Sequence, residues 1–241
     1  MLTGCWKRRQ TPLKTNKRIW ELDALRGTCI LIMVAVHLTF DLTELYGFFP
    51  RPRVRIYEML LSWGGVVFFL ISGICATLSS RSFRRGALVF GCGMGITAVT
   101  YLAGQNLAVY FGVLHCLGIS MMLWTVFRSF PTAALTAAAA GIILLGLLFQ
   151  QLQVSTSRLF WLGLTTPFFS SADFFPLFPF LGFFLLGAVW GRLLYNEKHT
   201  LLPKIDPQQP LLCFLQFCGR HSLPIYLLHQ PVILGILELI D

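Results

Sequence analysis

Four polar residues that could do chemistry lie within the first long apolar stretch of the sequence: Asp23, Arg26, His37 and Asp41. If this stretch is helical, at about 100° per residue, all four fall on one stripe of its surface. At a rise of about 1.5 Å per residue, Arg26 and His37 would lie roughly 16 Å apart along the axis. Ionisable groups are costly in lipid and usually face a protein interior or a water-filled cavity. The stripe therefore predicts a polar path along a membrane helix.

His37 is the strongest candidate for a catalytic group. A neutral imidazole can take a proton from an attacking hydroxyl or amine, and Asp41, one turn later, would orient the ring and stabilise its protonated form. The alternative is a His–Asp pair that only satisfies itself at the membrane interface. Arg26 presents a planar guanidinium suited to phosphate or carboxylate, and its alternative is an ion pair with Asp23 at the helix start.

A second polar centre interrupts the last apolar stretch. Tyr226, His229 and Gln230 lie within about one turn of one another. They are candidates for binding an acceptor or an oxyanion. The alternative is hydrogen bonding that holds helices together, at about 0.6 kcal/mol per contact. Two further candidates for the same site are His115 and Asp173.

Composition indicates an all-α, polytopic integral membrane protein. Of the 241 residues, 56% are hydrophobic and 12% charged, with a mean hydropathy of +0.70, whereas soluble domains carry about 25% charged residues. The net charge of +9 falls mostly in alternate loops, which fits the positive-inside rule better than nucleic-acid binding. The cysteines and histidines show no metal-ligand spacing, so we expect no metal.

The chain divides into a basic tail, residues 1–18, which we expect to be disordered and cytosolic, and one transmembrane domain, residues 19–241. The basic residues predict a cytosolic N-terminus and an external C-terminus. The connection 150–173 should hold a short interfacial helix near 158–164, and a polar, proline-containing loop should precede Ser222. We predict about seven membrane helices, near 20–42, 57–79, 87–103, 109–127, 132–149, 174–195 and 222–240.

Several short segments are familiar in combination. They are Trp20–Gly27, Phe68–Gly73, Phe111–His115, Asp173–Pro179 and Gly219–Pro231, together with His37 and Asp41. In combination they resemble the heparan-alpha-glucosaminide N-acetyltransferase catalytic-domain family, in particular its small bacterial members. The arginine, ten intervening residues and histidine that begin at Arg26 also look like the hallmark of the acyltransferase-3 family. Both families belong to a wider class of transmembrane acyltransferases.

The resemblance implies a helical bundle that takes acyl-CoA from the cytosol and passes an acyl group, most simply acetyl, to a hydroxyl or amine of a glycan or amino sugar outside. It implies that His37 is the catalytic base with Asp41 as its partner. It further implies that Arg26 belongs to the acyl-CoA site, with Arg84 and Arg85 beside it. Acetyl-CoA would be the donor, the bacterial cytoplasmic membrane the location, and a homodimer a possible assembly. The glucosamine substrate of the eukaryotic relative is not carried over, because at His37 the chain is closer to the acyltransferase-3 arrangement.

A non-enzymatic alternative comes from another class of membrane protein. The same stripe could line a polar passage in a transporter, a channel or an envelope assembly component. This alternative predicts flux or partner binding without turnover of acetyl-CoA. The absence of a visible internal repeat weakens it, because many transporters are built from inverted halves.

Overall fold

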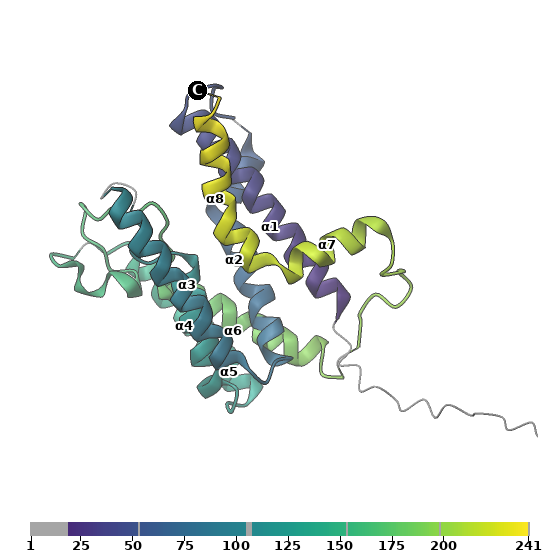
Figure 1. Ribbon diagram of the computed structural model, residues 1–241. Coiled ribbons are helices and arrows are strands. Elements are labelled where there is room, and N and C mark those ends of the chain that lie inside the picture. Colours follow the sequence, from purple (N-terminus) through teal and green to yellow (C-terminus); the bar gives the residue numbers. More distant parts are fainter. Residues whose placement is uncertain (1–18, 53, 105–107, 153, 198, 241) are drawn as a thin grey trace, which may run out of the picture.

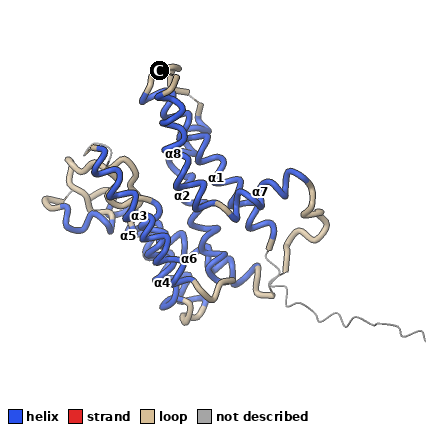
Figure 2. The backbone as a smooth tube through the Cα atoms, in the orientation of Figure 1, coloured by secondary structure: helices blue, strands red, loops and turns tan. Residues whose placement is uncertain are grey.

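The computed structural model describes residues 19–52, 54–104, 108–152, 154–197 and 199–240. Within these residues the fold is helical and contains no named strand, and one isolated bridge joins Phe111 to Phe174 (Figure 2). The expected all-α fold is confirmed, and the basic tail lies outside the described residues. In chain order (Figure 1), the elements are α1 (Trp20–Phe40), η1 (Asp41–Leu45), α2 (Arg55–Thr77), α3 (Ser82–Ala103), α4 (Val113–Phe127), α5 (Thr132–Phe149), η3 (Ser157–Leu162), α6 (Leu177–Leu194), α7 (Pro210–Arg220) and α8 (Ser222–Glu238).

Four helices in the described residues are long and apolar enough to cross a membrane: α3, α5, α6, and α1 with its π-helical extension η1. The pair α7 and α8 makes a fifth if it is counted as one span, bent by 83°. The other two expected spans correspond to shorter apolar helices, α4 and the Trp63–Thr77 part of α2. The chain is therefore an integral membrane protein with four to five candidate spans in this part, and the expected number of seven is not confirmed.

α7 is an element that the sequence pattern did not predict. We expected a polar loop up to Ser222, but a helix begins at Pro210 and ends at Arg220. Proline is well suited to the first turn of a helix, because the backbone N–H that it lacks would have no partner there. In Figure 1, α7 lies across the N-terminal half of α1, whereas α8 continues alongside α1 in the same direction.

Several helix pairs pack through glycines, which let two backbones approach closely. A Cβ atom on Gly27 of α1 would collide with the Leu215 carbonyl of α7, and one on Gly219 of α7 would collide with the Asp23 carbonyl of α1. Similar close crossings join α2 to α6 at Gly73 and Gly187, and α3 to α4 at Gly86 and Gly118.

The hydrophobic core lies around α6. In the apolar window of α6, 56% of the residues are buried, against 11% to 17% in the other three candidate spans. Phe184 and Leu185 of α6 are fully buried, as are Phe69 of α2 and Leu135 of α5. Large apolar side chains such as Leu102 are exposed on other helices, as expected where lipid replaces a protein neighbour.

The connection between α5 and α6 folds back onto the start of α4. It contains the 3-10 helix η3, which agrees with the short helix expected near 158–164. The Ala172 N–H donates to the Ala108 carbonyl at 3.2 Å, and the Phe175 N–H donates to the Phe111 carbonyl at 2.9 Å. These two bonds hold Asp173, which lies between them in sequence, against the N-terminus of α4.

Candidate active site

The last turn of α1 meets α8, and two histidines from opposite ends of the sequence come together there. The ring centroids of His37 and His229 are 5.0 Å apart, and the ring planes are inclined by 80° in an edge-to-face contact. Both side chains are partly buried. Two centres that the sequence suggested separately therefore form one site.

Asp41 is buried, with only 3% of its surface exposed, at the point where α1 passes into η1. Its carboxylate accepts a hydrogen bond from the Gln230 side-chain amide at 2.9 Å and interacts electrostatically with the His229 ring. The sequence suggested His37 as its partner, but no hydrogen bond joins these two side chains within the described residues. Asp41 therefore connects α1 to α8.

His229 has a defined tautomer because one of its ring nitrogens contacts a group that can only accept. Its Nδ1 lies 2.6 Å from the Tyr226 carbonyl oxygen, so Nδ1 carries the proton and, in the neutral ring, Nε2 carries a lone pair. The Nε2 atom is buried, as is Oε1 of Gln230, and neither has a hydrogen-bond partner in the described part of the chain. Such atoms are rare in folded proteins and call for an explanation.

Tyr226 extends the site toward Asp173. The tyrosine hydroxyl donates to Asp173 Oδ2 at 3.4 Å, and the Val113 N–H at the start of α4 donates to the same oxygen at 3.0 Å. Burial raises the pKa of the Asp173 carboxyl, and the two hydrogen bonds act in the opposite direction. Gly112 is needed here because a Cβ atom at this position would collide with the Asp173 carboxylate.

His115 lies in the first turn of α4, next to the backbone N–H groups that face Asp173, and both of its ring nitrogens are engaged. Nδ1 accepts from the Gly112 N–H at 3.2 Å, and Nε2 lies 3.2 Å from the Thr97 hydroxyl. Since that hydroxyl donates its only proton to the Val109 carbonyl, His115 must donate through Nε2. A ligand could bind either nitrogen only by breaking one of these bonds, so the geometry favours a positioning role.

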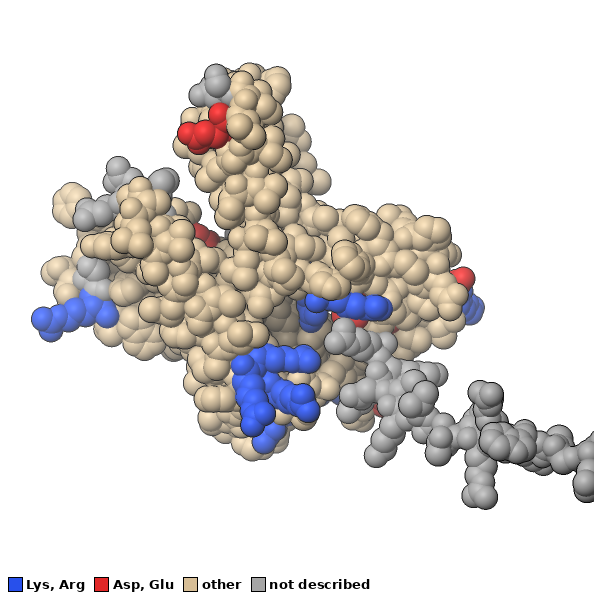
Figure 3. Space-filling model, viewed as in Figure 1, with Lys and Arg blue, Asp and Glu red and all other residues tan. Residues whose placement is uncertain are grey.

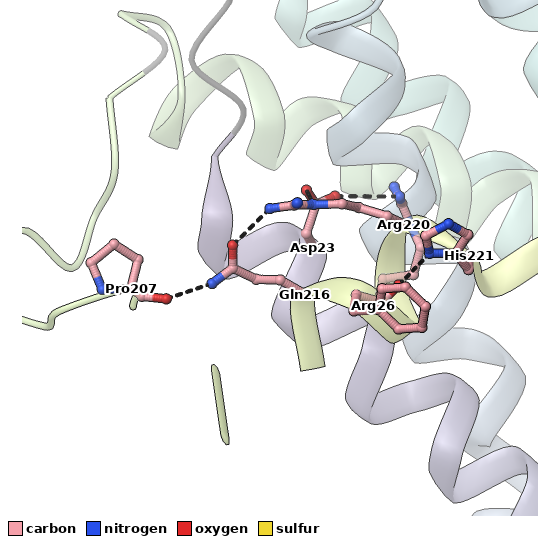
Figure 4. Close-up of polar contacts among 7 residues, drawn as sticks. Asp23, Arg26, Pro207, Gln216, Arg220 and His221 are labelled. Atoms are coloured by element: carbon pink, nitrogen blue, oxygen red, sulfur yellow. Dashed lines mark hydrogen bonds and ion pairs between the residues drawn. The ribbon is translucent and has the colours of Figure 1, made fainter. Parts of the chain in front are cut away.

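A second polar cluster lies at the N-terminal half of α1 (Figure 4). Asp23 stands between two arginines, with Arg26 Nη1 at 3.8 Å from one carboxylate oxygen and Arg220 Nε at 3.4 Å from the other. Arg220 also donates to Gln216 Oε1 at 2.9 Å, and Gln216 donates to the Pro207 carbonyl at 2.8 Å. The sequence suggests the Asp23–Arg26 pair but does not indicate that Arg220 and Gln216 join it. Their spacing of four residues on one helix face was the available signal.

Glu21 adds another connection at the same end. Its carboxylate accepts from the Thr200 hydroxyl at 2.6 Å and from the Leu201 N–H at 2.7 Å. These bonds attach the loop before α7 to the first turn of α1. The start of α1 is thus held by both the loop and α7.

Arg84 and Arg85 are neighbours in sequence but differ in their surroundings. Arg85, like Arg26, interacts electrostatically with Cys75 of α2. Arg84 lines a cavity of about 460 Å³ together with two other arginines, and none of the three has an ion-pair partner within the described residues. In Figure 3, most visible Lys and Arg side chains gather on the lower half of the molecule. The cavity is lined by Ser80, Arg81, Ser82, Phe83, Arg84, Trp124, Thr125 and Arg128.

The two ends of α1 therefore carry different chemistry. The N-terminal end offers guanidinium groups that suit a phosphate-bearing ligand, and the C-terminal end offers imidazole, carboxylate and amide groups. Among the described residues, no three His, Cys, Asp or Glu side chains gather as a metal site would require.

Comparison with known proteins gave one family. A family model described as "Heparan-alpha-glucosaminide N-acetyltransferase, catalytic" matches residues 18–231. No curated protein and no solved structure gave a match. The matched segment covers α1 to α7 and extends into α8 as far as Pro231, so both clusters and the histidine pair lie within it.

Proposed function

The chain belongs to the heparan-alpha-glucosaminide N-acetyltransferase catalytic family, and we propose that it moves an acetyl group from cytosolic acetyl-CoA to a hydroxyl or amine of an extracytoplasmic glycan or amino sugar. Family membership carries the coarser statement, that the protein is a membrane acetyltransferase. The donor, the acceptor class and the direction across the membrane are our proposal.

The observation that carries the proposal is the separation of two polar centres along α1. Arg26 and Asp23 lie in its first two turns, and His37 and Asp41 lie at its other end. α7 and α8 contribute to these centres in the same order, through Arg220 and then His229. A transferase that receives its donor on one side of a membrane and its acceptor on the other needs this arrangement.

We assign the N-terminal end to the donor. Acetyl-CoA carries phosphate groups, for which arginine is a suitable partner because its planar fork donates two parallel hydrogen bonds. Arg26 and Arg85 act on the same thiol, Cys75, and Arg84 lines the neighbouring basic cavity with its three unpaired guanidinium groups. Our proposed acyl-CoA-binding residues are Arg26, Arg84 and Arg85.

We assign the other end to the chemistry. His37 and Asp41, together with His229 and Gln230, form the proposed catalytic centre. Acyl transfer requires a base for the nucleophile and a donor to the oxyanion of the tetrahedral intermediate. The Tyr226 hydroxyl, which donates to Asp173, is a candidate oxyanion donor. His115 accepts from the Gly112 N–H and so supports the start of α4, where the Val113 N–H donates to Asp173.

The membrane setting follows from the same assignment. With the arginine-rich end in the cytosol, as the positive-inside rule requires, the N-terminus is internal, the C-terminus is external, and the histidine pair lies toward the outer face. We propose the bacterial cytoplasmic membrane as the location. We also propose that the protein can form a homodimer. Nucleic acid has no part in this function.

Binding of acetyl-CoA tests the donor assignment and the non-enzymatic alternative together. In detergent, acetyl-CoA should raise the thermal midpoint of the protein and free acetate should not. Arg84→Ala should weaken acetyl-CoA binding about tenfold, which corresponds to roughly 1.4 kcal/mol. Arg158→Ala, which changes an exposed arginine on η3 away from this cavity, should leave it unchanged. No stabilisation by millimolar acetyl-CoA, combined with solute flux in vesicles, would favour a transporter instead.

A further inference from the structure

Two neighbouring side chains of α8 end in buried atoms that lack a partner. In the described residues, three buried side-chain atoms have no hydrogen bond, and two of them are Nε2 of His229 and Oε1 of Gln230. A buried polar atom without a hydrogen-bond partner destabilises the fold. A purely structural role for these two side chains would not explain why this cost is retained. Their position beside His37 and Asp41 places both atoms within the proposed catalytic centre.

Both atoms are hydrogen-bond acceptors. Nδ1 of His229 donates to the Tyr226 carbonyl, which leaves the lone pair of the neutral ring on Nε2. The amide nitrogen of Gln230 donates to the Asp41 carboxylate, which assigns the other amide atom as the carbonyl oxygen. A group that satisfies them must therefore bring N–H or O–H donors.

We propose that His229 is the general base of the reaction and that Gln230 binds the same nucleophile. The acceptor donates one N–H or O–H to Nε2 of His229, and a further N–H or O–H of the acceptor donates to Oε1 of Gln230. This inference rests on the proposed acyl transfer. It assigns the proton to His229 in place of His37, the base that the family resemblance implied, and leaves His37 as the ring that contacts the base.

The contacts around the two histidines favour His229 for this role. Its ring orientation is fixed by the Tyr226 carbonyl, and the Asp41 carboxylate acts on it electrostatically. His37 has no side-chain hydrogen bond in the described part of the chain and contacts His229 through its ring. The titratable groups that face His229 are thus Asp41 and His37 from the α1 side and Tyr226 from α8.

The step balances without any further reactant. The nucleophile loses its proton to Nε2 of His229 as its nitrogen or oxygen forms a bond to the thioester carbonyl carbon. The tetrahedral intermediate then collapses, the C–S bond breaks, and the electron pair leaves with sulfur. The imidazolium returns its proton to the thiolate, which gives free CoA and a neutral ring.

The test compares two histidines with similar backbone contacts on the full-length protein in detergent. His229→Gln removes the proposed base. His221→Gln is the matched control, because Nδ1 of His221 also contacts a backbone carbonyl, that of Phe217 at 2.9 Å, but the side chain is exposed at the α7–α8 bend. Glucosamine and hydroxylamine serve as probe acceptors, and release of CoA thiol and binding of acetyl-CoA are both measured.

We expect His229→Gln to lower kcat at least 100-fold while acetyl-CoA binding stays within twofold of wild type, and His221→Gln to retain wild-type kcat. In His229→Ala, added imidazole should restore part of the turnover, which a merely structural histidine would not permit. Gln230→Met should raise the KM for the acceptor more than it lowers kcat. If the wild type turns over and His229→Gln keeps more than a tenth of its kcat, the inference is wrong but the proposed function stands. If the wild type releases no CoA with either acceptor, the proposed function fails and this inference with it.

Discussion

Gln230 of α8 donates a hydrogen bond to the buried carboxylate of Asp41, at 2.9 Å, across the contact between α8 and the point where α1 passes into η1. This bond holds α8 at the height where His229 meets His37. Only 3% of the surface of Asp41 is exposed, so its carboxylate relies on the Gln230 amide for a hydrogen bond that water would otherwise supply. The two residues are 189 positions apart in sequence, so the bond is set by tertiary packing alone.

Replacing Gln230 with leucine should destabilise the protein through Asp41. Leucine fills a similar volume but leaves the buried carboxylate without its donor, which costs about 1–3 kcal/mol. Thermal unfolding in detergent should show a lower midpoint for Gln230→Leu, and most of the loss should be recovered in the double variant Asp41→Leu/Gln230→Leu. A single variant that melts with the wild type would show that the bond does not contribute.

The crossing of α1 and α7 provides a second test. Gly27→Ala places a methyl group against the Leu215 carbonyl, and overpacking of this kind costs about 1–3 kcal/mol. The same substitution at Gly235 of α8, where a Cβ would meet no atom within 4 Å, should be neutral or slightly stabilising because alanine favours helix. The thermal midpoint should fall for Gly27→Ala and not for Gly235→Ala. Equal midpoints would contradict the close crossing.

The pKa of Asp173 gives a dependence of stability on pH. Because burial raises this pKa above its ordinary value of 3.8, the folded protein prefers the protonated carboxyl. The protonated Asp173 carboxyl makes its whole contribution to the free energy of unfolding below pH 3.8. This contribution is lost as the pH rises through the raised pKa of the folded state. Asp173→Asn keeps an acceptor oxygen for the Val113 N–H but cannot ionise.

The comparison for Asp173 is the difference in midpoint between wild type and Asp173→Asn from pH 4 to pH 7. We expect the wild type to lose stability relative to the variant as pH rises. A difference that does not change with pH, or one that changes in favour of the wild type, would show that hydrogen bonding outweighs burial at this carboxyl.

The sequence predicted the positions of most helices, though not the number of membrane spans, because helix positions depend on local patterns. Apolar runs broken by proline, glycine and basic residues located seven of the helices to within about five residues at each end. Asp23, Arg26 and His37 lie on α1, and Asp41 begins its extension η1. α7 was missed because the lysines and prolines that precede it, up to Pro210, favoured a polar loop as far as Ser222. The shortness of α4 also escaped, since its apolar run continues into the non-helical segment before Val113.

Partners within the site could not be predicted because they come from distant parts of the chain. The helical period correctly set His37 and Asp41 one turn apart, but it could not indicate that the Asp41 side chain meets Gln230. Nor could it show that Arg84 and Arg85, adjacent on α3, have different neighbours. The sequence suggested His115 for the acceptor or oxyanion site, but its two occupied ring nitrogens favour a structural role.

The central claim, transfer of an acetyl group across the membrane at the His37 end of α1, is tested most directly in sealed vesicles. Purified protein is reconstituted with acetyl-labelled acetyl-CoA on the side of the arginine-rich end and glucosamine on the other side, and the label on glucosamine is measured for wild type and His37→Ala. We predict labelled product with equimolar CoA release for the wild type, and a rate roughly tenfold lower for a folded His37→Ala variant that still binds acetyl-CoA, because this variant loses the ring that contacts the proposed base His229. Equal rates for the two proteins would contradict the account.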